Sequence, residues 1–62
     1  MRNNICGADV HKAFVNISII DEGGREIYRG KYKYKLQGIL KLLATIVAMQ
    51  CTKIAIESTD HL

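Results

Sequence analysis

Several features are missing from this sequence of 62 residues, and their absence narrows the class of protein. There is no proline, no low-complexity segment, no internal repeat and no linker, so we expect residues 1–62 to form a single domain or part of one. No apolar run approaches the roughly 18 residues that a membrane-spanning helix needs. The start, Met1-Arg2-Asn3-Asn4, is not followed by the apolar core of a signal peptide. We therefore expect a cytoplasmic protein without a membrane partner.

Cysteine is scarce, and acidic residues are outnumbered by basic ones. Cys6 and Cys51 lie far apart and neither belongs to a Cys-x-x-Cys pair, so we interpret them as buried thiols of a cytosolic protein. Nine Lys and Arg against six Asp and Glu give a net charge of +3, which fits a nucleic-acid partner without requiring one. Hydrophobic residues make up 48% of the chain, which indicates a globular protein.

Hydrophobic periodicity predicts three strands, a helix and a fourth strand, over residues 5–10, 13–20, 25–34, 36 to about 50, and 52–57. The first strand is a continuous apolar run, which is typical of a strand buried on both faces. The second strand alternates, and its predicted core face holds Ala13, Val15, Ile17 and Ile19. The turn signal Asp21-Glu22-Gly23-Gly24 predicts an antiparallel hairpin of the second and third strands.

The helix has an apolar stripe at i, i+3, i+4 and i+7 spacing, which we expect to be core. Its members are Leu36, Ile39, Leu40, Leu43, Ile46, Val47 and Gln50. No Ser, Thr, Asp or Asn stands beside the first residue of the stripe, so the start of the helix is uncertain by a few residues.

The order β-β-β-α-β makes the helix a crossover, which brings the last strand parallel to one strand of the meander. The first strand is the best neighbour, because it is the one predicted to be buried on both faces. We therefore predict an α/β fold with sheet order 3-2-1-4, numbered along the chain, and with strands 1 and 4 parallel. One helix covers only one face and strand 4 keeps a free edge, so we expect a truncated domain or a homo-oligomer.

Two predicted strands end in a carboxylate, Asp9 and Glu57. In the predicted sheet both acids lie at the C-terminal ends of neighbouring parallel strands, where open α/β sheets place their ligand sites. Paired carboxylates suit Mg²⁺ or Mn²⁺, and such ions align the attacking and leaving oxygens of a phosphodiester. The alternative is structural: Asp9 caps a turn, and Glu57 pairs with Lys12 or Lys53.

The third strand has a basic stripe with interleaved tyrosines, formed by Arg29, Lys31, Lys33 and Lys35. Such a stripe suits a phosphate backbone, with Tyr32 or Tyr34 available for base stacking. It is equally typical of the charged outer face of an edge strand. His11 and Lys12 follow the first acid, where they would contact a phosphate or a metal-bound water, or form a solvated turn.

The segment Gly7-Ala8-Asp9-Val10-His11-Lys12 resembles the Gly-x-Asp-Val-x-Lys opening of the DEDD transposases, the insertion-sequence family that includes the Piv-type DNA invertases. The segment Ile56-Glu57-Ser58-Thr59 resembles the second acidic motif of the same family, Glu-Ala/Ser-Thr-Gly. The order and spacing of the two motifs also match, so the resemblance covers essentially the whole chain. It departs at Asp60, where the family usually has glycine.

The resemblance implies the N-terminal portion of a RuvC-like domain with a ribonuclease H-like fold. It also implies that four acids, Asp-Glu-Asp-Asp, hold divalent metal for DNA cleavage and exchange, with Asp9 as the first and Glu57 as the second. The other two acids would lie beyond residue 62, so we expect the 62-residue chain to be inactive alone. DNA, and a guide RNA, are the partners that the resemblance implies.

Two other hypotheses remain open. The chain is alternatively a small non-catalytic nucleic-acid-binding module that uses Lys12, Arg29, Lys31 and Lys33. A nucleotide-binding half of an actin or sugar-kinase type fold also opens with a strand that ends in aspartate. That fold needs a glycine-rich phosphate loop, and His11-Lys12-Ala13 stands there instead.

Overall fold

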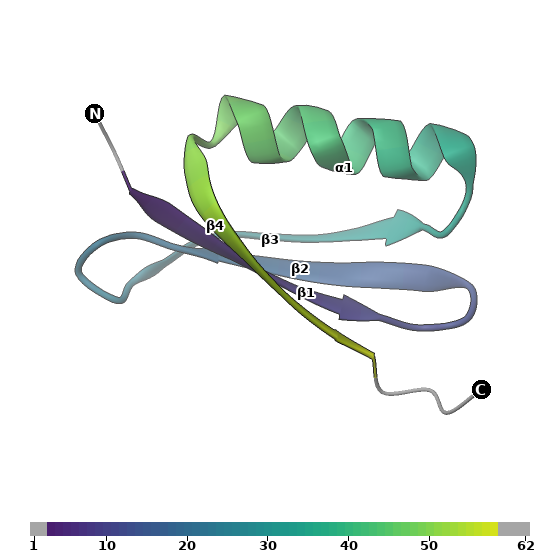
Figure 1. The fold of residues 1–62 in the computed structure, drawn as a ribbon, viewed down its shortest axis with the longest axis horizontal. Coiled ribbons are helices and arrows are strands. Elements are labelled where there is room, and N and C mark those ends of the chain that lie inside the picture. Colours follow the sequence, from purple (N-terminus) through teal and green to yellow (C-terminus); the bar gives the residue numbers. More distant parts are fainter. Residues whose placement is uncertain (1–2, 59–62) are drawn as a thin grey trace.

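Four strands and one helix follow one another along the chain in a computed structural model, which describes residues 3–58. The elements are β1 (Asn4–Val10), β2 (Phe14–Ile20), β3 (Glu26–Lys33), α1 (Leu36–Ala48) and β4 (Cys51–Ser58). The strands form one sheet in the order β3-β2-β1-β4, and α1 lies along one of its faces (Figure 1). Only β1 and β4 are parallel neighbours. The predicted topology, sheet order and strand directions are therefore confirmed.

The hairpin of β2 and β3 is closed by the predicted turn. One carboxylate oxygen of Asp21 accepts hydrogen bonds from the backbone N–H groups of Gly23 and Arg25, at 2.9 and 3.0 Å. Gly24 has a φ of 85°, in the left-handed region that glycine adopts without steric cost. The aspartate and the glycine thus explain why the chain reverses at this point.

The core lies between the sheet and α1. Its buried members are Cys6, Ala8, Val15, Ile17, Ile19, Leu42 and Ile46. The prediction that the first strand is buried on both faces is wrong, since Ile5 is 41% exposed on the face that α1 does not cover. Ala13 lies outside β2 and is exposed, so it is not core either. Cys6 is buried as predicted and burial raises the pKa of its thiol, whereas Cys51 is half-buried.

The face of α1 that contacts the sheet matches the predicted stripe only in part. Ile46 is buried and Ile39 packs against the core as predicted, but the buried Leu42 lies outside the stripe. Four residues of the predicted stripe are exposed: Leu36, Leu40, Leu43 and Val47. The helix is set by its close approach to β3, where a Cβ atom on Gly38 would lie 2.0 Å from the carbonyl oxygen of Lys33. Leu36, Leu40, Leu43 and Val47, which we call the outer stripe, are therefore left facing solvent.

A chain of hydroxyl groups also fastens α1 to β3. Thr45 donates a hydrogen bond to the carbonyl of Lys41, so its oxygen accepts from the hydroxyl of Tyr32, 2.8 Å away. Tyr32 in turn accepts from Tyr28 at 2.6 Å, and this bond is the main reason that the pKa of Tyr28 is raised. Tyr32 is thus packed beneath the helix, so of the two tyrosines predicted as alternatives for base stacking it is Tyr34 that lies exposed. Tyr34 is 54% exposed.

The C-terminal end of α1 is tied to the start of β1. The side-chain amide of Asn4, which is 3% exposed, donates a hydrogen bond to the carbonyl of Met49 at 2.6 Å. Gln50 follows with a φ of 56°, a left-handed conformation that usually calls for glycine after a helix. At the other end, Lys35 makes no side-chain capping hydrogen bond, in agreement with the missing cap in the sequence.

Candidate functional site

The open face of the sheet, opposite α1, carries polar and charged side chains along with the exposed Ile5 and Ile20. Cross-strand partners share a face, so the sheet register gives one row across all four strands: Lys31 on β3, Asn16 on β2, Asp9 on β1 and Glu57 on β4. The two predicted acids are therefore direct neighbours on one face. Adjacent strands lie about 4.8 Å apart, which places the two carboxylates within reach of one ligand.

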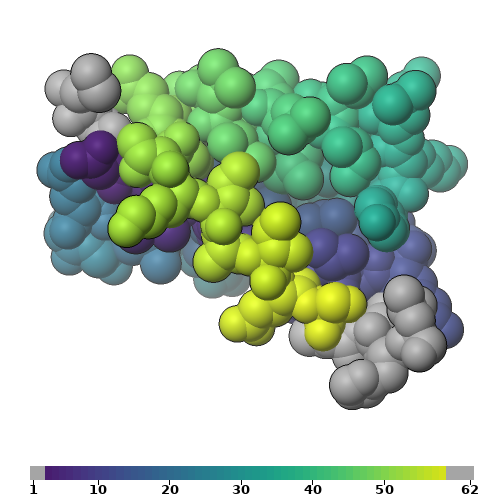
Figure 2. Space-filling model, viewed as in Figure 1, coloured from purple at the N-terminus to yellow at the C-terminus, as the bar shows by residue number. Residues whose placement is uncertain are grey.

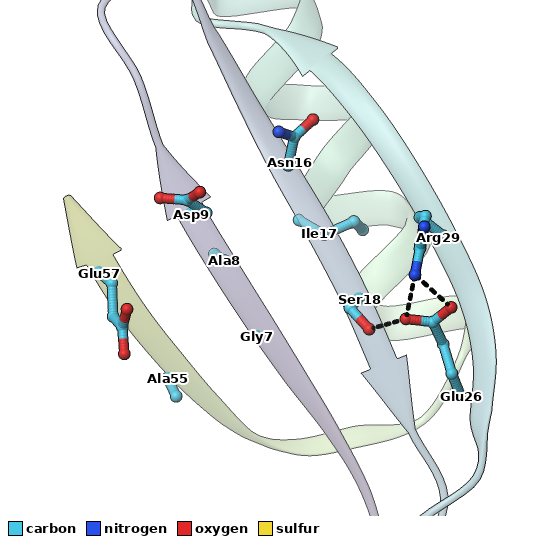
Figure 3. A pocket seen from close by; sticks show the side chains of 10 residues that line it. All are labelled: Gly7, Ala8, Asp9, Asn16, Ile17, Ser18, Glu26, Arg29, Ala55 and Glu57. Carbon is cyan, nitrogen blue, oxygen red and sulfur yellow. Dashed lines mark hydrogen bonds and ion pairs between the residues drawn. The ribbon is translucent and has the colours of Figure 1, made fainter. Parts of the chain in front are cut away.

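The neighbouring row consists of Arg29, Ser18, Gly7 and Ala55, and all but Arg29 are small. Together with the acids, this row lines a hollow of about 600 Å³ (Figure 3). Gly7 and Ala55 carry no long side chain, so the backbone of β1 and β4 is accessible beside the carboxylates. The hollow therefore offers space next to the acid pair for a ligand.

Asp9 has one satisfied and one unsatisfied carboxylate oxygen. Its Oδ2 lies 3.1 Å from Nε2 of His11, which is the next residue but one in the chain. Its Oδ1 is buried and has no hydrogen-bond partner within residues 3–58. A buried carboxylate oxygen without a partner costs free energy, and a bound cation or a donor on a ligand removes that cost.

Glu57 is exposed at the end of β4. The alternative that it pairs with Lys53 is not observed, since the described part of the chain has no ion pair between these two side chains. Ser58 follows it at the end of the strand, and Thr59 and Asp60 lie outside the described residues.

The acid pair fits a hard divalent cation but does not make a complete site. Asp9 and Glu57 offer carboxylate oxygens, which Mg²⁺ and Mn²⁺ prefer, and Mg²⁺ commonly binds through one or two carboxylates while keeping several waters. Within residues 3–58, no three or more His, Cys, Asp and Glu side chains gather into a group that would hold a metal ion. The described residues thus offer two neighbouring carboxylates and no complete ligand set.

The basic residues of β3 lie on the same open face as the acids but differ in their surroundings. Arg29 forms an ion pair with Glu26 at 3.1 Å, and Ser18 donates a hydrogen bond to the same carboxylate (Figure 3). The hydrogen bond from Ser18, and then that from Arg29, lower the pKa of Glu26. The charge of Arg29 is therefore largely balanced within the hairpin.

Lys31 is linked to Asp9 through ring contacts that the sequence did not reveal. Its ammonium nitrogen lies 4.2 Å from the centroid of the Phe14 ring, which stacks on the His11 ring at 4.4 Å between centroids. His11 contacts Asp9, so one row of contacts runs from the basic strand to the acid. Alternation had placed Phe14 on the second face of its strand, but its contacts with Lys31 and His11 do not follow from the cross-strand register, which pairs Phe14 with Lys33.

The remaining predicted contacts lie at the margins of the site. Lys12 is exposed in the connection of β1 and β2, and Lys33 is exposed opposite Phe14. A second hollow of about 380 Å³ lies near the N-terminal end of α1, with four lysines among its lining residues: Lys31, Lys33, Lys35 and Lys41. Basic groups therefore surround the end of β3 as well as the open face.

Comparison of the chain with protein-family models, with curated proteins and with solved structures gave no match. Within residues 3–58, no helix combines the length and the apolar character required to cross a membrane.

Proposed function

We propose that this chain is the N-terminal part of a metal-dependent DNA transposase or recombinase of the DEDD type, with a truncated ribonuclease H-like (RuvC-like) domain. The observation that carries the proposal is the register of Asp9 opposite Glu57 on adjacent parallel strands, with one oxygen of Asp9 buried and without a hydrogen-bond partner among residues 3–58. The motifs around these two acids, together with the sheet order, support the choice of this family over other metal-binding folds.

In this proposal Asp9 and Glu57 hold Mg²⁺ or Mn²⁺ on the open face. The cation, when bound, acts as a Lewis acid at a DNA phosphodiester. His11 lies against Oδ2 of Asp9, so it would orient the carboxylate that would hold the cation together with Glu57. The chain supplies two of four expected acids, so it is not expected to cleave DNA alone.

DNA is the proposed partner because basic side chains share the open face with the acids. Lys31 stands in the same cross-strand row as Asp9, two strand spacings or about 10 Å away, which is within the reach of a nucleic-acid backbone. Lys12 and Lys33 extend the positive charge, and Arg29 contributes where it is released from Glu26. A guide RNA is a further partner that the family resemblance suggests.

The test is a titration of the 62-residue chain with Mn²⁺, followed by paramagnetic broadening of its amide NMR signals. We expect broadening centred on Asp9 and Glu57, and its loss in Asp9→Asn and in Glu57→Gln. Glu22→Gln is the matched control, because Glu22 is an exposed acid in the turn of the β2–β3 hairpin. Broadening that is the same in Asp9→Asn as in the unmodified chain would refute the metal site.

The second candidate is a nucleic-acid-binding module without catalysis, favoured by the contact of Lys31 with Phe14 on the open face. This module should bind single-stranded DNA or RNA with strong salt dependence, because each phosphate contact releases a counterion. Binding would survive Asp9→Asn and weaken in the double variant Lys31→Gln, Lys33→Gln. If Asp9→Asn abolishes binding in the presence of Mn²⁺, the metal-dependent function is favoured instead.

A further inference from the structure

The outer edge of β4 ends the described sheet. One side of β4 pairs with β1, and no described strand pairs with the other side. The side chains of β4 stand at the surface (Figure 2). Ile54 is 47% exposed and Ile56 is 69% exposed. An edge with unpaired backbone groups and apolar side chains is a template for another strand.

The sequence of β4 is symmetric about Ala55, apart from the sign of its charges. It runs Thr52-Lys53-Ile54-Ala55-Ile56-Glu57-Ser58. Read backwards, the segment has a hydroxyl residue at each end and an isoleucine on each side of Ala55, as it does when read forwards. Only the charged positions differ, because the reverse order exchanges Lys53 with Glu57. A strand of this pattern is complementary to an antiparallel copy of itself.

We propose that β4 pairs antiparallel with β4 of a second copy of this chain, about a two-fold axis at Ala55, to give a continuous eight-stranded sheet. On the open face, Lys53 of each copy then lies opposite Glu57 of the other, which forms two ion pairs. On the face that α1 partly covers, Ile54 of each copy lies opposite Ile56 of the other. Thr52 and Ser58 are opposite each other at the two ends.

The two-fold symmetry limits the possible registers. The axis is perpendicular to the sheet and passes beside a residue that lies opposite its own copy, so each alternative register places the axis beside a different residue of β4. An axis at Ile54 would set Lys53 opposite Ala55, and an axis at Ile56 would set Glu57 opposite Ala55. Only the axis at Ala55 joins opposite charges and also brings the isoleucines together.

Apolar burial adds to the ion pairs. Ile54 and Ile56 lie on the same sheet face as Cys6 and Ala8, their partners in β1, yet α1 packs mainly over β3 and leaves them exposed. The second copy would bring four isoleucines into one cluster over the joined strands. Removal of such side chains from water is the main favourable term in association, and the charges fix the register.

The first experiment is analytical ultracentrifugation of the 62-residue chain over a range of concentrations. We expect a monomer–dimer equilibrium. Lys53→Glu and Glu57→Lys each place two like-charged pairs across the axis, so each should weaken the dimer at least about tenfold. The double variant Lys53→Glu, Glu57→Lys restores both ion pairs with reversed sign and should restore the dimer. Lys41→Glu is the control, because it changes the net charge as Lys53→Glu does, on the exposed surface of α1.

Cross-linking tests the register itself. Opposite residues of an antiparallel pair have Cα atoms about 4.5 to 5.5 Å apart, which suits a disulfide. Ala55→Cys should therefore give covalent dimers on mild oxidation, beyond those that the native cysteines give in the unmodified chain. Thr52→Cys is the control, since its two copies would lie at opposite ends of the pairing.

A monomer at all concentrations, or a double variant that stays monomeric although circular dichroism shows it folded, would overturn the proposal. So would covalent dimers that are equally abundant for Thr52→Cys and Ala55→Cys. The inference stands apart from the proposed metal site. Asp9→Asn removes the metal ligand and leaves the β4 edge intact, whereas the double charge reversal removes Glu57 as a metal ligand and keeps the dimer.

Discussion

At the scale of single residues, the surroundings of each acid decide its role. Within residues 3–58, one oxygen of Asp9 has no hydrogen-bond partner, whereas the carboxylate of Glu26 is bound by Ser18 and Arg29 on the same face. Two carboxylates in one hollow therefore differ, because that of Glu26 is committed to the hairpin and that of Asp9 is not. The sequence indicated Asp9 as a candidate ligand, because Asp9 ends an apolar run.

The sequence did not predict the second carboxylate, and a β-bulge explains why. Strict alternation places Glu26 on the same face as Tyr28, away from Arg29. The ladder of β2 and β3 shifts between Ile19 and Ile20, and this irregularity sets Glu26 opposite Ile20 on the open face. A bulge changes the face of every residue beyond it and leaves little trace in a short sequence. Side-chain facing could therefore be predicted only up to the bulge.

The lowered pKa of Glu26 gives a pH dependence with a defined sign. Because this pKa is below its unfolded value, the hydrogen bonds of Glu26 stabilise the fold at neutral pH. That contribution is fully present above the unfolded pKa of about 4.3 and is lost as pH falls through the lower folded value. Glu26→Gln should therefore destabilise the chain at pH 7 and match it near pH 2, as measured by urea unfolding.

Glu22→Gln serves as the control for this series, since Glu22 is an exposed acid in the same hairpin. Its unfolding free energy should follow that of the unmodified chain at every pH. A constant difference between Glu26→Gln and the unmodified chain from pH 7 to pH 2 would contradict the role assigned to Glu26.

At the scale of elements, the position of α1 was the main feature that the sequence left open. The apolar residues of the helix occupy more than one stripe, so periodicity identified a helix but did not decide which face is buried. Contacts of the helix with β3 made that choice, through Gly38 against Lys33 and through the hydroxyl chain of Tyr28, Tyr32 and Thr45. Strand order was predictable because it follows from general rules of chain connection.

Tyr32 tests this anchoring of the helix. Tyr32→Phe keeps the ring but leaves the hydroxyl groups of Tyr28 and Thr45 without their shared partner, so we expect a loss of about 1 to 2 kcal/mol in unfolding free energy. Urea unfolding followed by circular dichroism measures it. Tyr34→Phe is the control, because Tyr34 is 54% exposed, and an equal loss in both variants would contradict the anchoring role.

The C-terminal end of α1 offers a stabilising change. Gln50 adopts a φ of 56°, which costs a residue with a side chain about 1 kcal/mol relative to glycine. Gln50→Gly should therefore raise the unfolding free energy by about 0.5 to 1 kcal/mol, despite the greater freedom of glycine in the unfolded chain. Gln37→Gly, within the first turn of α1, should lower it. A destabilised Gln50→Gly variant would show that the helix end is not strained.

At the scale of the whole molecule, the two faces of the sheet differ in the side chains that they expose. The open face has a hollow beside Asp9 and Glu57, together with the exposed side chains of Ile5 and Ile20. The opposite side keeps apolar surface at the outer stripe and on β4, which α1 does not shield. The sequence predicted that one helix cannot cover both faces of the sheet and the edge of the last strand. It did not predict which apolar residues stay exposed, because that depends on where α1 sits.

Glu57 belongs to both proposed sites, and this couples metal binding to self-association. A divalent cation at Glu57 neutralises the carboxylate that attracts Lys53 of the second copy and repels that ammonium group. By linkage, a ligand that weakens the dimer must itself bind more weakly to the dimer. We therefore expect saturating Mn²⁺ to raise the dimer dissociation constant by about threefold or more, relative to NaCl at equal ionic strength, in sedimentation equilibrium.

The double variant Lys53→Glu, Glu57→Lys should form a dimer that does not respond to Mn²⁺. An unmodified chain whose dimerisation ignores Mn²⁺, while NMR shows the ion bound beside Asp9, would place the cation away from Glu57.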